Sequence, residues 1–177
     1  ILYSKSKSST IFYNCSFSKV KGNSVMYMEN AISADISDCQ FTSCEVSDSL
    51  ISAEQATNFT ISNNLFSNNE GSIKFGELVE TGLIYNNTFQ GCSTTDGGAL
   101  YINGKAESSM IEIKDNDFTE CSATNGLAIY ITDRVKSVDI HDCKFTDNKG
   151  DLGYTIDSKA KALTFTDSVI QYEDEDS

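Results

Sequence analysis

The sequence predicts an all-β protein, a parallel β-helix solenoid of about seven coils that are 23–29 residues long. Three observations lead to this fold class. One pattern of apolar and Asn or Asp residues recurs along nearly the whole chain. Amphipathic helices are not expected, because Gly, Asn–Ser clusters or β-branched runs interrupt most segments long enough to form one. The 177 residues include 39% hydrophobic residues, which suits one narrow core rather than a disordered chain.

Three positions define the repeat. The anchor is a Phe, or an Ile in the last repeat: Phe17, Phe41, Phe66, Phe89, Phe118, Phe145 and Ile170. Five residues earlier stands another large apolar side chain: Phe12, Ile36, Ile61, Ile84, Ile113, Ile140 or Phe165. Three residues before the anchor stands Asn or Asp in every repeat: Asn14, Asp38, Asn63, Asn86, Asp115, Asp142 and Asp167.

The odd spacing between the two apolar positions predicts a bend. In one straight strand, residues five apart face opposite sides, yet both should be buried. Asn and Asp tolerate the left-handed conformation that a sharp bend needs. A third apolar stretch follows a polar turn, at residues 25–28, 50–53, 72–75, 97–102, 127–131 and 154–156. Each unit is therefore strand, bend, strand, turn, strand, in a single solenoid over residues 1–171 with an acidic tail at 172–177.

The motif F-x-x-[NC] followed by G-G-A-[ILV] resembles the polymorphic outer-membrane-protein repeat. The second half is intact once, at Gly97-Gly98-Ala99-Leu100. The resemblance implies a right-handed β-helix of the pectin-lyase-like class. Because Cys residues and glycan acceptor sites accompany it, the composition resembles secreted surface proteins of unicellular eukaryotes more than bacterial autotransporters. The first half of the motif recurs as FTSC (41–44), FSNN (66–69), FQGC (89–92), FTEC (118–121) and FTDN (145–148).

Composition limits the partners and the location. With 26 acidic residues and 13 Lys plus Arg, the net charge is −13, which disfavours nucleic acid and anionic membrane surfaces. No apolar run is long enough for a transmembrane segment or a signal peptide, so membrane insertion is not expected. The chain begins at Ile1 without an initiator Met, which suggests a processed protein or a piece of a longer one. We expect an extracellular or cell-surface location.

The cysteines predict two disulfides between adjacent coils. Cys15 and Cys39 share the column two residues before the anchor, and Cys92 and Cys121 share the column three residues after it. Neighbouring coils place Cα atoms about 4.8 Å apart, within the disulfide range. Six buried, stacked thiols are the alternative, and neither Cys44 nor Cys143 has a partner in its column. No Cys/His spacing predicts a zinc site.

Three sequons predict N-glycosylation at Asn14, Asn58 and Asn86. Two of these acceptors, Asn14 and Asn86, occupy the bend column at a corner of the rod. The neighbouring pairs Asn63-Asn64 and Asn86-Asn87, with Asn116, predict a structural ladder of stacked amides along the axis. We expect covalent N-glycans on the three Asn side chains of the sequons.

Asp115, Asp142 and Asp167 lie in one column on three successive coils. Carboxylates this close recruit a cation or raise one another's pKa. The simpler interpretation is that they are solvated bend residues, since Asn serves the same column elsewhere. Weak calcium binding is the remaining alternative, and no other cofactor is predicted.

No catalytic residue is predicted, and the chain is not expected to be an enzyme. Pectate lyases of the resembled class use an Arg base beside an acidic calcium site, but Arg134 is the single Arg here and lies in a turn. The expected function is a structural glycoprotein: a segment of a surface fibre, coat or adhesive stalk that self-associates head to tail. One alternative is a glycan-binding adhesin module that uses Tyr101 and Tyr130; a less favoured one is a degenerate polysaccharide lyase or hydrolase.

Overall fold

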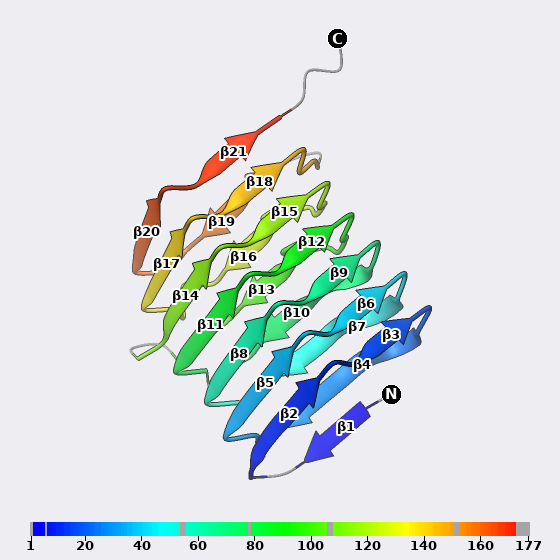
Figure 1. Cartoon of the computed structure of the whole chain (residues 1–177). Coiled ribbons are helices and arrows are strands. Elements are labelled where there is room, and N and C mark those ends of the chain that lie inside the picture. The colour runs from blue at the N-terminus through cyan, green and yellow to red at the C-terminus, as the bar shows by residue number, and fades with distance from the viewer. Residues whose placement is uncertain are drawn as a thin grey trace.

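The computed structural model describes residues 2–5, 7–53, 56–77, 79–105, 108–150 and 153–172, and it is a parallel β-helix with three sheets of seven strands (Figure 1). Sheet A contains β1 (Leu2–Lys5), β4 (Lys21–Glu29), β7 (Glu45–Ala53), β10 (Glu70–Phe75), β13 (Leu100–Ile102), β16 (Ile129–Ile131) and β19 (Ile156–Ser158). Sheet B contains β2 (Ser9–Tyr13), β5 (Ser33–Ser37), β8 (Asn58–Ser62), β11 (Thr81–Tyr85), β14 (Met110–Lys114), β17 (Ser137–His141) and β20 (Ala162–Thr166). Sheet C contains β3 (Ser16–Ser18), β6 (Gln40–Thr42), β9 (Leu65–Ser67), β12 (Thr88–Gln90), β15 (Asp117–Thr119), β18 (Lys144–Thr146) and β21 (Val169–Gln171).

The predicted repeat is confirmed. Every strand pair is parallel, and the three strands of one coil follow one another in the order expected from the sequence. Seven strands in each sheet correspond to about six turns between the first and the last, one fewer than the predicted seven coils. Sheet A strands match the third apolar stretches, although β19 begins at Ile156 rather than at residue 154. Within the described ranges no helix is long and apolar enough to cross a membrane.

The bend column has the predicted backbone conformation. Its seven residues have φ between 49° and 57°, in the left-handed region. The bend turns the chain from sheet B to sheet C, so the apolar residue before it and the Phe after it both point inward. The members are Asn14, Asp38, Asn63, Asn86, Asp115, Asp142 and Asp167.

A second left-handed column, two residues after the anchor, was not predicted. It ends each short strand of sheet C and turns the chain toward sheet A. Because its residue types share no pattern, no composition signal marks it. The members are Lys19, Ser43, Asn68, Gly91, Glu120 and Asp147.

Stacked phenylalanines form the centre of the core. Neighbouring rings in the anchor column lie 4.8–5.0 Å apart between centroids, with interplanar angles of 1–16°. The Ile positions of sheet B stack in the same register on successive strands. Burial of these large apolar side chains supplies most of the driving force for stacking the coils.

The predicted amide ladder is also present. Asn64, Asn87 and Asn116 are buried in one column, and each Asn side chain accepts the backbone N–H of the coil before it, as in the 3.0 Å bond from Asn64 N to Asn87 Oδ1. The Asn87 amide nitrogen also donates to Ile61 O at 2.9 Å. The ladder thus satisfies backbone groups at the bend that would otherwise be buried without partners. A shorter column with Asn69 and Asn148 does the same after sheet C.

The diglycine of the repeat motif has a steric explanation. Gly97 has φ of 63°, a left-handed conformation that favours glycine. A Cβ on Gly98 would lie 2.1 Å from Leu127 O in the next coil. The turn into β13 therefore needs one glycine for its conformation and the other for close packing of two coils.

Candidate functional site

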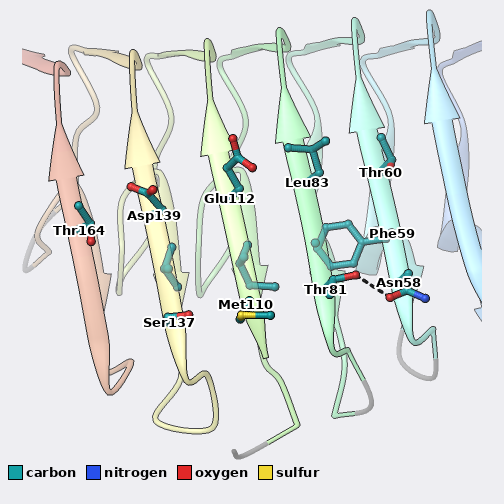
Figure 2. Close-up of a pocket in the computed structure, with 13 residues that line it drawn as sticks. Asn58, Phe59, Thr60, Thr81, Leu83, Met110, Glu112, Ser137, Asp139 and Thr164 are labelled. Atoms are coloured by element: carbon teal, nitrogen blue, oxygen red, sulfur yellow. Dashed lines mark hydrogen bonds between the residues drawn. The ribbon is translucent and has the colours of Figure 1, made fainter. Parts of the chain in front are cut away.

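A groove of about 560 Å³ lies on the outer face of sheet B, across β8, β11, β14, β17 and β20 (Figure 2). One row of outward side chains crosses it in register: Thr60, Leu83, Glu112, Asp139 and Thr164. At its β8 edge, Thr81 Oγ1 donates to Asn58 Oδ1 at 2.5 Å. The sequence did not predict this groove.

The two carboxylates of the groove, Glu112 and Asp139, lie in register on adjacent strands. Lys114 Nζ is 2.8 Å from Glu112 Oε1, and this bond holds the pKa of Glu112 below its ordinary value. His141 Nε2 is 3.3 Å from the same oxygen, while His141 Nδ1 is 2.8 Å from Asp142 Oδ2. The Asp142 contact raises the pKa of His141.

The Glu112 carboxyl is a poor proton donor at neutral pH, because its pKa is lowered. The single Arg is occupied elsewhere: Arg134 Nε donates to Gly104 O at 3.4 Å, and Nη1 lies 3.7 Å from Glu77. A lyase or hydrolase stays an untested alternative. Assays on acidic glycans with and without calcium would detect it.

A second depression, of about 270 Å³, lies on the outer face of sheet A. Tyr101 lines one side of the depression. Its other lining residues include the charged Asp48, Lys74 and Asp96 and the hydroxyl residues Ser72 and Thr94. Lys74 Nζ lies 3.2 Å from Asp48 Oδ1. We call this depression the Tyr101 pocket.

Tyr101 and Tyr130 lie on adjacent coils as expected, but they stack on each other. Their centroids are 5.5 Å apart with an interplanar angle of 21°. Lys159 Nζ covers the Tyr130 ring at 4.9 Å from its centroid and donates to Tyr130 Oη at 2.7 Å. The stack occupies one face of each ring, and of the two rings Tyr101 lines the pocket.

The structure has all six cysteines as free thiols, the alternative that the sequence left open. The predicted partners are neighbours: Cys15 N donates to Cys39 Sγ at 3.4 Å. Contact with the Cys92 sulfur, reinforced by burial, raises the pKa of Cys121 well above its ordinary value. The bridges Cys15–Cys39 and Cys92–Cys121 stay predictions that non-reducing mass spectrometry tests.

Cys44 and Cys143, for which the sequence predicts no disulfide partner, occupy the columns expected for them. Cys44 N donates to Asn69 Oδ1 at 2.9 Å, and Cys143 N donates to Ser168 Oγ at 3.0 Å. Burial raises the pKa of Cys143 to about 11. A thiol that stays protonated in this way is a weak nucleophile.

The three predicted glycosylation acceptors differ in exposure. Asn14 and Asn86 are exposed bend residues at the corner between sheets B and C. Asn58 is half-buried at the start of β8, where its side chain accepts the bond from Thr81. Attachment at all three stays a prediction.

The three aspartates of the possible cation site, Asp115, Asp142 and Asp167, are exposed bend residues on successive coils. Among the described residues, no group of three or more His, Cys, Asp or Glu is placed to hold a metal ion. The predicted acidic tail lies outside the described residues, except for Tyr172.

The parallel sheets, the two bend columns and the stacked core define the class of protein as a parallel β-helix. The family model for a right handed beta helix region matches residues 1–170, and the chain belongs to this family. No curated protein and no solved structure matches the chain. The finer resemblance to polymorphic outer-membrane-protein repeats stays an expectation from the motif.

Proposed function

We propose that the chain is a structural segment of an extracellular surface assembly, and that its two end coils stack on further copies of the chain. The observation that supports this proposal is the exposed apolar end of the solenoid. N-glycans at the bend column would be compatible with such stacking, because they project sideways from a corner.

The last coil exposes residues from the core columns. Leu163 is 44% and Ile170 is 45% exposed, whereas Phe145, one coil earlier in the anchor column, is 0% exposed. Among the described strands, β19, β20 and β21 each pair on one side only. Open edges with apolar side chains favour pairing with another strand-rich surface.

The first coil offers a complementary end. Strands β1, β2 and β3 also pair on one side only, and they lie at the opposite end of the rod from β21 (Figure 1). Residues 1–21 contain four Lys and no Asp or Glu, whereas residues 153–177 contain six acidic residues and two Lys. The contrast in charge between the first and the last segment of the sequence favours head-to-tail over head-to-head contact. The basic residues are Lys5, Lys7, Lys19 and Lys21.

The test is light scattering coupled to size exclusion over a range of protein concentrations, with electron microscopy of the same fractions. We expect mass to increase with concentration and rods to lengthen. The variants Leu163→Lys and Ile170→Lys should abolish this increase, because each places a charge on the end surface. High salt should weaken association, because the attraction between the ends is screened.

Met110→Lys is the matched control. Met110 is 55% exposed but lies in the groove of sheet B, away from both ends. The Met110→Lys variant should leave the increase of mass with concentration unchanged. A chain that stays monomeric at every concentration, or that loses association equally with Met110→Lys, contradicts the proposal.

A further inference from the structure

The Tyr101 pocket is built by an irregularity in sheet A. Between β7 and β10, Glu45 pairs with Glu70 and Ser49 pairs with Ser72, so residues 46–48 lie opposite Gly71 alone. The extra residues form a bulge, which re-aims side chains at the surface of a sheet. Ser47 and Asp48 thereby border the pocket on the side opposite Tyr101.

Tyr101 offers a fixed aromatic wall. Its stack on Tyr130, which Lys159 covers in turn, limits the freedom of the ring before any ligand arrives. Burial also raises the pKa of Tyr101, which reflects the partly desolvated position of its hydroxyl. A preset aromatic surface loses little entropy on binding.

The polar groups around the ring are partly committed. Asp48 Oδ1 pairs with Lys74, and Asp96 Oδ1 accepts from Asn125 Nδ2 at 2.8 Å. Asp48 Oδ2 accepts from Ser49 Oγ at 3.4 Å, but a carboxylate oxygen has lone pairs for more than one donor, and Asp96 Oδ2 and the Ser72 and Thr94 hydroxyls can also bond to a ligand. The pocket thus has acceptors and donors arranged around one aromatic ring.

We propose that the Tyr101 pocket binds one ring of a neutral sugar. Sugar hydroxyls both donate and accept, which suits carboxylates beside an ammonium and hydroxyls, while the C–H face of the ring packs on an aromatic side chain. Two carboxylates against one ammonium disfavour uronic and other acidic sugars. The volume of about 270 Å³ is below the roughly 300–1,000 Å³ of pockets for drug-sized ligands, so a single ring fits.

The test is a titration of the isotope-labelled chain with D-glucose, D-galactose, D-mannose and D-glucuronate, followed by amide shifts in NMR. At least one neutral hexose should shift the amides of Asp48, Lys74, Asp96 and Tyr101, with a dissociation constant in roughly the millimolar range. The dissociation constant of glucuronate, measured from the same amide shifts, should be at least about tenfold higher. The result does not depend on self-association, since a monomer has the complete pocket.

Variants separate binding from stability. Tyr101→Ala should weaken binding about tenfold, whereas Tyr101→Phe should keep it, because the aromatic face is retained. Tyr85→Ala, which changes a tyrosine on sheet B outside the pocket, is the control. The proposal is wrong if none of the three hexoses shifts the pocket amides, if glucuronate binds as well, or if Tyr85→Ala weakens binding as much as Tyr101→Ala.

Discussion

Buried amides satisfy backbone groups from one coil to the next. In the middle of the ladder, Asn87 is 2% exposed and bonds both to the N–H of Asn64 and to the carbonyl of Ile61. A side chain at this position therefore has to accept from a backbone N–H and donate to a backbone carbonyl of the preceding coil. Cysteine occupies the same column in other coils, where its sulfur contacts carbonyl oxygens, as Cys39 does with Ser37 O.

Replacement of Asn87 by Ala should lower the free energy of unfolding by about 2–4 kcal/mol, because it leaves two buried backbone groups without partners. Urea unfolding measures the loss. Thr88→Ala, on the exposed neighbouring residue, is the control and should stay within about 0.5 kcal/mol of the original protein. Similar losses for both variants would contradict the role of the ladder.

The single histidine reports on its two carboxylate neighbours. NMR titration should give His141 a pKa above the ordinary value of about 6.5, because protonation strengthens its bonds to Asp142 and Glu112. Since the folded pKa is raised, its small stabilising contribution is complete below the unfolded pKa and is lost as pH rises through the folded pKa.

Asp142→Asn should lower the pKa of His141 more than Glu112→Gln does, because the Asp142 bond is the larger cause of the shift. The two variants therefore control for each other. A pKa at or below the ordinary value in the original protein, or a larger effect of Glu112→Gln, would overturn this assignment.

At the scale of single elements, the sequence predicts those bends and strands that the same residue types mark in every repeat. The Asn or Asp column identifies the first bend because only a few residue types adopt its conformation easily. The second bend escapes prediction, since Lys19, Ser43 and Glu120 adopt the same conformation with no shared chemistry. There the geometry follows from the tertiary structure: a three-residue strand must turn before the next sheet begins.

Glycine is the better residue for this second bend. Glu120→Gly should raise the free energy of unfolding by up to about 1 kcal/mol, because a left-handed residue other than Gly costs about 1–2 kcal/mol and the flexibility of Gly in the unfolded chain offsets about half. Thermal unfolding measures the change. Thr119→Gly, inside β15, should instead destabilise the protein; a loss of stability in both variants would refute the interpretation.

At the scale of the whole molecule, the sequence predicts the axis and the core but not the surface depressions. The Phe and Ile columns follow from spacing alone, and the structure confirms their register. The Tyr101 pocket depends on a bulge opposite Gly71, and the groove on sheet B combines side chains from five coils. Such features arise from how unequal coils stack, which no single repeat reveals.

The two bend columns have a consequence for how such a protein changes in evolution. The bend residues recur in register from coil to coil, although the third strand and its turn differ in length, so a complete repeat can be gained or lost while the stacking of the bends and of the Phe column is kept. Every repeat changes the length by about 4.8 Å. The number of repeats in the gene therefore acts as a ruler for the length of the rod.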